Sequence, residues 1–294
     1  MTFTSQEDKR VPELPEVETM VRGLRAALGG RIIESVEIHD PLLIRGCDAR
    51  EFERRARKVT VEAVLRRGKW VVLTLADHRG LIVIQPRMTG GFWLVEPPRP
   101  EHIRLTFRLE SPGPLIWYCD ARRLGRVHWF GTSAEAENAF ARSHGPDALE
   151  ITAADLATRL RRTRRAIKPA LMDQKVVAGI GNIYADEILF AARIAPTRIA
   201  AWLSRVELAR LHTAIGHVLR LAIAAEGSSF DTGYRTVLGL EGGFLAQNAM
   251  YGRAGLPCRG CGRPIVKTRI AGLIGRPTYF CPACQGRGKT RRVT

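Results

Sequence analysis

Four of the six cysteines have the spacing of a metal site. Two residues lie between Cys258 and Cys261, two lie between Cys281 and Cys284, and 19 residues separate the two pairs. Two such pairs can give four thiolates to one tetrahedral zinc ion of the structural type. Disulfides are the alternative, but the polar N-terminus has no apolar secretory segment, and paired C-x2-C spacing favours a metal. We therefore expect one structural zinc ion.

The charge of the chain suggests a polyanionic partner. The 294 residues carry 46 Lys and Arg against 29 Asp and Glu, a net charge of +17, and 39 of the 46 are arginines. Arginine suits phosphates and base edges, so nucleic acid is the expected partner. A merely basic surface, with arginines that reflect a GC-rich genome, is the alternative. The chain contains no run of about 18 apolar residues, so no membrane span is predicted.

The first half of the chain is predicted to hold one helix and then a β-rich region. From Pro15, apolar residues recur at three- and four-residue spacing until Gly29-Gly30, which predicts a helix. Short β-type runs separated by turn residues follow, a rhythm typical of an antiparallel sandwich or barrel. The runs are Ile32–Ile38, Val59–Leu65, Trp70–Leu75, Leu81–Gln85, Phe92–Val95, Ile103–Leu109, Leu115–Cys119 and Val127–Phe130.

After Thr132 the apolar period becomes helical. Ser204 and Glu207 predict a capping box at the start of the last helix. The Gly-rich stretch Gly227–Gly243 predicts a long loop. The expected helices are Ala134–Arg142, Ala153–Arg162, Ala170–Lys175, Tyr184–Ala192 and Arg205–Ala225.

A series of short motifs gives these elements a family context. In chain order they are Pro12–Glu18 (PELPEVE), Arg67–Lys69, Met88–Gly90, Asp120–Gly125, Gly179–Glu187, Tyr251–Arg253 and Arg276–Cys281. In this order the chain resembles the formamidopyrimidine-DNA glycosylase family, on the Fpg side of the Fpg/Nei enzymes. The matches run from Pro12 to about Gln285, so the resemblance covers nearly the whole chain.

The resemblance implies base excision by a covalent route. Pro12 would be the nucleophile, Glu13 the acid/base that helps open the sugar, and Lys69 a residue near the lesion and its phosphate, while Glu16 would help to organise the site. A terminal amine suits this reaction, because an α-amino group titrates at about 7.7–8.0 and lysine at about 10.4.

This sequence departs from the family at the nucleophile, because eleven residues precede Pro12. An internal proline nitrogen is an amide, and its delocalised lone pair cannot form an iminium. One explanation is a misplaced start, in which Val11 is a GTG initiator codon that is read as Met and removed. The other is a real extension on an inactive or rerouted paralogue. The intact Glu13 and Lys69 favour the first.

The family takes the damaged base out of the stack, so side chains must fill the gap. By resemblance these are Met88, Arg122 and Leu124. The family usually has Phe where this chain has Leu124, so stacking is lost there and apolar wedging remains. Gln85-Pro86-Arg87 also replaces the usual His-Leu-Gly before Met88, which changes the loop.

The resemblance also implies a set of residues around the DNA backbone. Asn182, at a Gly-flanked turn between two helices, would grip phosphate together with helix N–H groups. Lys168, Arg123 and Arg276 would contact the same backbone, and His102 is a phosphate contact by position, with a structural histidine as the alternative. The hairpin that carries Arg276 has about three more residues between its cysteine pairs than the family commonly shows.

Together these features predict an α+β multidomain chain. It would comprise an N-terminal antiparallel β-sandwich with a leading helix, a helical helix–two-turn–helix domain and a C-terminal zinc-finger β-hairpin. The expected boundaries are an extension at 1–11, the catalytic β-sandwich at 12–131, the helical DNA-binding domain at 132–248, the zinc finger at 249–286 and a basic tail at 287–294.

The predicted function is that of a bifunctional DNA glycosylase/AP lyase for oxidised purines such as formamidopyrimidines and 8-oxoguanine. It would act as a monomer on damaged double-stranded DNA, away from membranes, in the bacterial cytoplasm at the nucleoid. A Nei-like preference for oxidised pyrimidines is the alternative within this class. The alternative outside it is a non-catalytic protein that binds damaged DNA, with Pro12 blocked by the extension.

Overall fold

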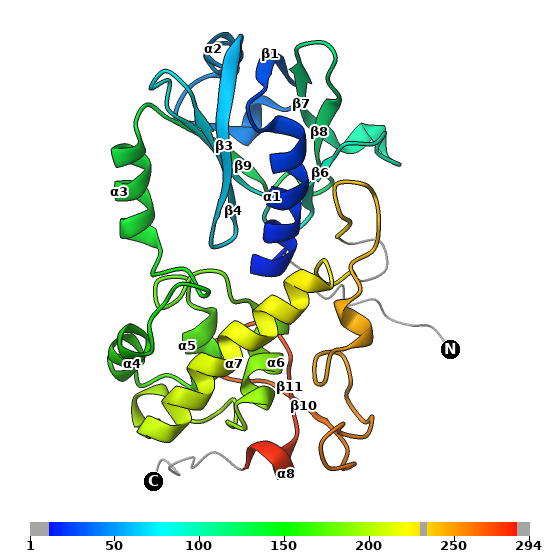
Figure 1. Cartoon of the computed structure of the whole chain (residues 1–294). Coiled ribbons are helices and arrows are strands. Elements are labelled where there is room, and N and C mark those ends of the chain that lie inside the picture. Colours follow the sequence, from blue (N-terminus) through cyan, green and yellow to red (C-terminus); the bar gives the residue numbers. More distant parts are fainter. Residues whose placement is uncertain (1–11, 230–233, 287–294) are drawn as a thin grey trace.

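The computed structural model describes residues 12–229 and 234–286 of the chain. A β-rich lobe and a helical lobe are stacked one above the other, and helix α1 reaches from the sheet to the boundary between them (Figure 1). The predicted extension 1–11, the basic tail 287–294 and positions 230–233 of the predicted loop lie outside the described residues.

Helix α1 (Leu14–Leu28) confirms the predicted leading helix. Pro15 lies in its first turn, where a missing N–H costs nothing. Its buried face is formed by apolar residues at helical spacing, which face the sheet. These are Val17, Met20, Val21, Leu24 and Leu28. The helix thereby holds Pro12 and Glu13, just before its first turn, at the junction of the two lobes.

The β-rich lobe is a single sheet that bends into two layers. Its strand order is β2-β9-β5-β4-β3-β1-β7-β8-β6, and all neighbouring pairs are antiparallel except β2 with β9. Strands β1 and β3 share only two residue pairs, which makes this the corner. One apolar core contains residues of both halves, as expected for a sandwich. The strands are β1 (Ile32–Ile38), β2 (Ile44–Arg45), β3 (Val59–Arg67), β4 (Trp70–Leu75), β5 (Leu81–Gln85), β6 (Gly90–Trp93), β7 (Ile103–Leu109), β8 (Leu115–Asp120) and β9 (Arg126–Phe130).

Three features of this lobe differ from the sequence prediction, the first being the two-residue strand β2, which no predicted run covers. Helix α2 (Ala49–Ala56) was missed because it is mostly charged, although Asp48 caps it and its apolar side consists of Phe52 and Ala56. Strand β6 begins and ends two residues before the predicted run. It leaves the sheet because the Leu94 N–H donates instead to the Val237 carbonyl, at 2.7 Å.

The helical lobe is built around its own apolar core, which also takes in Leu14 of α1. The capping box of Ser204 and Glu207 at the start of α7 is confirmed. Helix α5 begins and ends three residues before its predicted range, because the Asp173 carboxylate and carbonyl bind the next backbone N–H groups and end it. The helices are α3 (Ser133–Ser143), α4 (Ala153–Arg161), α5 (Ile167–Met172), α6 (Asn182–Ala191) and α7 (Arg205–Ala224).

The C-terminal segment is a small hairpin, β10 (Val266–Thr268) with β11 (Thr278–Phe280), followed by the short helix α8 (Pro282–Gln285). It packs on the core of the helical lobe through apolar residues such as Ile265, Leu273 and Tyr279. Single 3-10 turns occur at Pro41–Leu43, Pro100–His102, Ala200–Trp202 and Phe244–Ala246.

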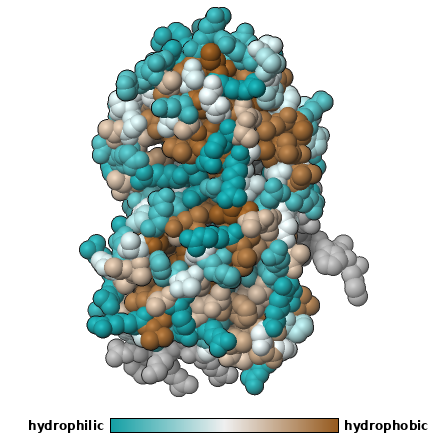
Figure 2. Space-filling view, viewed as in Figure 1, coloured by the Kyte–Doolittle hydropathy of each residue, from teal (hydrophilic) through white to brown (hydrophobic). Residues whose placement is uncertain are grey.

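Among the described helices, none combines the length and the apolar character that crossing a membrane requires. The face seen in Figure 2 carries many hydrophilic residues, with smaller hydrophobic patches between them.

Candidate active site

The carboxylate of Glu13 lies at the N-terminus of helix α6. It accepts hydrogen bonds from the backbone N–H groups of Gly181, at 2.6 Å, Ile183, at 2.9 Å, and Tyr184, at 3.4 Å. The Leu14 N–H donates to the Gly179 carbonyl at 3.0 Å beside it. Glu13 is 3% exposed, and Pro12 is buried too. Residues that are 165 or more positions apart in the chain therefore form one compact site.

These contacts change one expectation. The N–H groups at the start of α6 were expected to hold phosphate, but three of them bind Glu13. A Cβ at Gly181 would overlap the Glu13 carboxylate, so only glycine permits this approach.

Lys69 lies in the charge environment of Glu13. Burial raises the pKa of Glu13 above its ordinary value, and the Lys69 charge and the three N–H groups oppose that rise. Burial lowers the pKa of Lys69, while the negative charge of Glu13 opposes this and the positive charge of Arg276 adds to it. The structure thus brings Glu13, Lys69 and Arg276 together from the N-terminus, the β3–β4 turn and the zinc hairpin.

A second buried carboxylate supports the first. One oxygen of Glu16 accepts from the Glu13 N–H at 2.9 Å. The other accepts from the Tyr184 hydroxyl at 2.5 Å and the Ser228 N–H at 2.8 Å. Burial, with a contribution from the charge of Glu13, raises the pKa of Glu16 to about 7. Glu16 therefore joins α1, α6 and the segment after α7.

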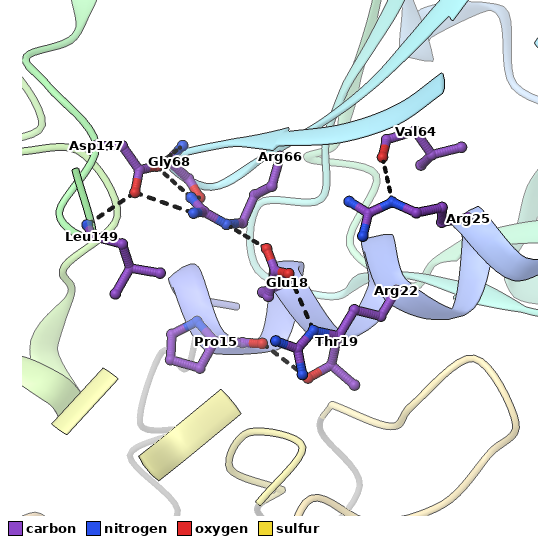
Figure 3. A network of polar contacts seen from close by, with 10 residues as sticks. All are labelled: Pro15, Glu18, Thr19, Arg22, Arg25, Val64, Arg66, Gly68, Asp147 and Leu149. Atoms are coloured by element: carbon purple, nitrogen blue, oxygen red, sulfur yellow. Dashed lines mark hydrogen bonds and ion pairs between the residues drawn. The ribbon is translucent and has the colours of Figure 1, made fainter. Parts of the chain in front are cut away.

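The turn that carries Lys69 is held between the lobes by a buried ion pair (Figure 3). The Arg66 guanidinium binds both oxygens of Asp147 and donates to Glu18 of α1 at 2.9 Å. Asp147 also accepts from the N–H groups of Gly68, at 2.8 Å, and Leu149, at 3.0 Å. Because Asp147 belongs to the helical lobe and Arg66 to β3, this pair fixes the Lys69 turn against the other lobe.

The three predicted gap-filling residues lie on two neighbouring loops of the β-rich lobe. Met88 and Leu124 are half-buried and Arg122 is exposed. Within the described part of the chain, the Arg122 guanidinium has no hydrogen bond or ion pair, although its backbone N–H donates to the Asp120 carboxylate at 3.2 Å. Their role in filling a gap stays a prediction.

Arg123 and His102 have contacts within the protein. The Arg123 guanidinium binds Asp40 through both carboxylate oxygens, at 2.6 and 2.8 Å, and holds the pKa of Asp40 below its ordinary value. This pair anchors the loop to the turn at Asp40. His102 is half-buried, and its Nε2 lies 3.9 Å from the Glu101 carboxylate.

Lys168 has a different environment from the expected one. Its side chain is fully buried, and its ammonium lies 2.8 Å from the Asp186 carboxylate while it donates to the Pro277 carbonyl at 2.9 Å and the Thr278 hydroxyl at 3.1 Å. In this arrangement Lys168 holds the strand that follows Arg276 and does not face solvent. All six residues of α5 are buried, so the whole helix, Lys168 included, lies within the helical lobe.

Asn182 and Arg276 have groups that are free to bind a ligand. The Asn182 side-chain oxygen is buried and has no hydrogen-bond partner among the described residues. Arg276 is exposed, and its guanidinium makes no hydrogen bond or ion pair with residues 12–229 or 234–286. Asn182 directly follows Gly181, whose N–H binds Glu13, and the positive charge of Arg276 acts on Lys69. Phosphate contacts by these two residues stay a prediction.

The four predicted zinc ligands converge. The sulfur atoms of Cys258, Cys261, Cys281 and Cys284 all lie within 4.8 Å of one another, and none is in a disulfide. The Cys258–Cys284 and Cys261–Cys281 distances are 3.9 and 3.5 Å. A tetrahedral zinc ion with Zn–S bonds of about 2.3 Å needs sulfurs about 3.8 Å apart, so the residues fit the ion. The Gly260 N–H also donates to the Cys258 sulfur, at 3.4 Å.

Comparisons with known proteins agree with this geometry. Three family models match: the formamidopyrimidine-DNA glycosylase N-terminal domain over residues 11–127, its H2TH domain over 144–233, and a zinc finger found in FPG and IleRS over 255–286. A formamidopyrimidine-DNA glycosylase of Desulfitobacterium hafniense is 40% identical, over 94% of this chain and 100% of its own. The chain belongs to the formamidopyrimidine-DNA glycosylase family.

Other members give the same match. The Bacillus subtilis formamidopyrimidine-DNA glycosylase is 40% identical over 94% of this chain and 99% of its own. The crystal structure of the MutM (Fpg) protein of Thermus thermophilus superposes with a TM-score of 0.82 at 38% identity, covering 94% of this chain and 100% of that one. A Lactococcus lactis FPG mutant solved with Fapy-dG containing DNA gives 0.84 at 30% identity, with the same coverage. The family, fold class and structural zinc predicted from the sequence are thus confirmed.

Sequence reasoning missed the residues that hold the family motifs together. Asp186 and Glu187 lie in the Gly179–Glu187 motif but were given no role. Asp186 accepts from the Tyr279 N–H at 3.0 Å, and Glu187 accepts from the N–H groups of residues 249–251. Two adjacent acids in an apolar helix were the available signal, since such groups are buried only when paired.

Proposed function

We propose that this protein is a bifunctional DNA glycosylase/AP lyase of base excision repair that removes oxidised purines from double-stranded DNA. Its family membership supports the reaction class, and one observation of the structure carries the assignment of the site. That observation is the buried carboxylate of Glu13, placed between Pro12, the N-terminus of α6 and the charge of Lys69.

The proposed reaction begins with attack of the Pro12 secondary amine on C1′ of the damaged nucleoside. The C1′–N bond breaks, and the base leaves with the bonding electrons and takes up a proton. Opening of the sugar and loss of the amine proton give an iminium ion. Removal of a C2′ proton then expels the 3′ phosphate oxygen, and a second elimination expels the 5′ one.

Glu13 suits the part of proton donor in this scheme. Because burial raises the pKa of Glu13, its protonated form is more populated near neutral pH than that of an exposed glutamate. Lys69 suits the role of a cation near the lesion, since its ammonium is influenced by the charges of Glu13 and Arg276.

DNA would lie across the boundary of the two lobes. We assign phosphate contacts to Asn182 and Arg276, whose polar groups are unpaired in the described structure, and a weaker one to His102. Met88, Arg122 and Leu124 would fill the gap left by the extruded base. The charges of Arg123 and Lys168 are paired with Asp40 and Asp186. We therefore assign these two residues the role of anchoring the DNA-binding elements, in place of direct contact with phosphate.

The proposal requires Pro12 to carry a free amine, as it would if the mature chain begins at this residue. The alternative is a non-catalytic protein that binds damaged DNA, and the residues before Pro12 are the observation that favours it. We propose in either case a monomer that acts on the DNA of the bacterial nucleoid in the cytoplasm.

The test compares two forms of the full protein, one that begins at Met1 and one that begins at Pro12 after removal of the initiator Met, each verified by mass. Each is incubated with an 8-oxoguanine duplex and borohydride, which reduces the iminium to a stable adduct. We expect a covalent adduct with the Pro12 form and none when Pro12 is acylated by Val11. Failure of the Pro12 form to trap, with DNA binding retained, would establish the binding-only alternative. Excision from a duplex with an oxidised pyrimidine measures lesion preference in the same assay.

A further inference from the structure

The two loops that carry Met88, Arg122 and Leu124 are joined by one hydroxyl group. Thr89 Oγ1 donates to the Oδ1 atom of Asp120 and accepts from the backbone N–H of Arg122 at 3.1 Å. Thr89 is the residue after Met88, and the Arg122 N–H lies in the other loop. The hydroxyl therefore bridges the two loops next to their gap-filling side chains.

The Asp120 carboxylate is the second group that links the two loops. It is fully buried, and besides the Thr89 hydroxyl it accepts from the N–H groups of Arg122, at 3.2 Å, and Gly125, at 2.6 Å. Its place follows from the sheet, because Gly90 at the start of β6 pairs with Asp120 at the end of β8. A buried carboxylate must be satisfied by such donors, so it favours the conformation of the loops that supplies all of them.

Both loops also rest on the same side chain. Tyr118 is fully buried in β8, and a Cβ at Gly90 or at Gly125 would overlap its hydroxyl group. Each loop can therefore come close to Tyr118 only through a glycine. The two loops therefore both pack against Tyr118 and are linked by the hydrogen bonds of Thr89 and Asp120.

We propose that Thr89, together with Asp120, is a positioning residue that makes the two loops enter the DNA as one unit. Met88 from one loop and Arg122 from the other then take their places in the gap together, because neither loop can shift without breaking the bonds of the Thr89 hydroxyl. This inference rests on the proposed gap-filling role of these side chains and adds how they are coordinated.

The experiment is a mutant cycle repeated in two backgrounds. Met88→Ala, Arg122→Ala and the double variant are made in the wild-type protein and again with Thr89→Val. The measured quantity is the dissociation constant for a duplex that contains a tetrahydrofuran abasic analogue. Thr89 is an exposed residue, so Thr89→Val removes the hydroxyl without opening the core. Thr89→Ser, which keeps the hydroxyl, is the matched control.

In the wild-type background we expect the loss in affinity of the double variant to be at least about 3-fold smaller than the product of the two single losses, as for residues that act together. In the Thr89→Val background the losses should multiply, and in the Thr89→Ser background the coupling should return. Because Thr89→Val takes one donor from the buried Asp120 carboxylate, it should melt below Thr89→Ser, and both proteins should be folded at the temperature of the binding assay.

Two results would overturn the inference, and they are distinguishable. If each single variant weakens binding but the coupling survives Thr89→Val, the bridge does not coordinate the loops, while the proposed gap-filling role stands. If neither Met88→Ala nor Arg122→Ala changes the dissociation constant, the gap-filling role fails and the inference fails with it.

Discussion

At the scale of single residues, the site is organised by buried carboxylates. Glu13 takes up three N–H groups of α6, and Glu16 receives one N–H from Glu13, another from Ser228 and the hydroxyl of Tyr184. Two acids at this spacing in a helix cap could have been read as ordinary first-turn charges. Both carboxylates are buried, unlike ordinary first-turn charges. A buried charge costs free energy and must be held by specific donors.

Glu16 makes the stability of the fold depend on pH. Its pKa is raised from 4.5 to about 7, so the folded state binds a proton that the unfolded state has released between these values. The contribution is fully present below pH 4.5 and is lost as the pH rises through about 7, with a slope of at most about 1.4 kcal/mol per pH unit.

We expect Glu16→Gln to remove the contribution of one titrating group to the slope of unfolding free energy against pH. The measurement is the free energy of unfolding by urea at several pH values from 5 to 8, compared between wild type and variant. Because burial also raises the pKa of Asp186 to about 7, the difference between the two curves is the quantity to read. Parallel curves for the two proteins would contradict the assignment.

At the scale of elements, the lobes are joined by Arg66 of β3 and Asp147 of the segment before α4. The side chains of this pair are 7% and 6% exposed, whereas those of Arg67 and Glu137, which also link β3 to the helical part, are 38% and 60% exposed. The two ion pairs use adjacent arginines but differ in burial and in the backbone N–H groups that only Asp147 accepts, which offers a comparison of a buried network with an exposed pair.

Asp147→Ala should destabilise the protein by about 3–5 kcal/mol, because it leaves the buried Arg66 charge with only part of its partners. Glu137→Ala should cost less than about 1 kcal/mol, since an exposed pair is screened by water. Urea unfolding of both variants measures this, and binding to abasic-analogue DNA tests whether the Lys69 turn has moved. Equal costs for the two substitutions would show that burial of the Arg66 pair has no special weight.

The zinc hairpin is a second element whose position depends on contacts with the helical lobe. Lys168, Asp186 and Glu187 hold it and the segment before it against the helical lobe, and its cysteine end joins the same apolar core. Because one zinc ion would join the cysteine pairs on either side of this hairpin, its removal should loosen the hairpin and with it Arg276.

We expect one zinc ion per chain, measured with a thiol-reactive release reagent and a metal-sensitive dye. The chelated protein should melt several degrees lower and bind damaged DNA more weakly, because structural zinc contributes directly to the folding free energy. Restoring zinc should restore both properties. A metal-free protein with unchanged affinity would contradict the assigned place of Arg276.

At the scale of the whole molecule, the net charge of +17 counts the full chain, including four cations of the tail 287–294 that lies outside the described residues. Several arginines are already paired with acids, as Arg66, Arg123 and Arg165 are. Among the exposed arginines without an ion pair in the described part of the chain, Arg276 is the one that we propose as a phosphate contact.

Binding to duplex DNA should weaken steeply with salt, with a slope of log affinity against log salt of about −0.9 per phosphate contacted. Arg276→Ala should reduce that slope by about 0.9, whereas Arg54→Ala, on α2 at the far end of the β-rich lobe, should leave it unchanged (Figure 1). Equal effects of the two substitutions would mean that the net charge acts as a whole, without a defined site.

The sequence by itself determined most of the elements, their order and the zinc ligands, because apolar periodicity, turn residues and cysteine spacing are local patterns. It did not reveal α2 and β2, which are too charged or too short for such a pattern. It also carried the motifs that mark the family. Only the tertiary structure decided that Glu13 occupies the N–H groups of α6, that Lys168 is buried against Asp186, and that Thr89 bridges two loops. Each of these depends on residues at least 18 positions apart, whose meeting follows from how the two lobes and the sheet pack, and no local pattern encodes that packing.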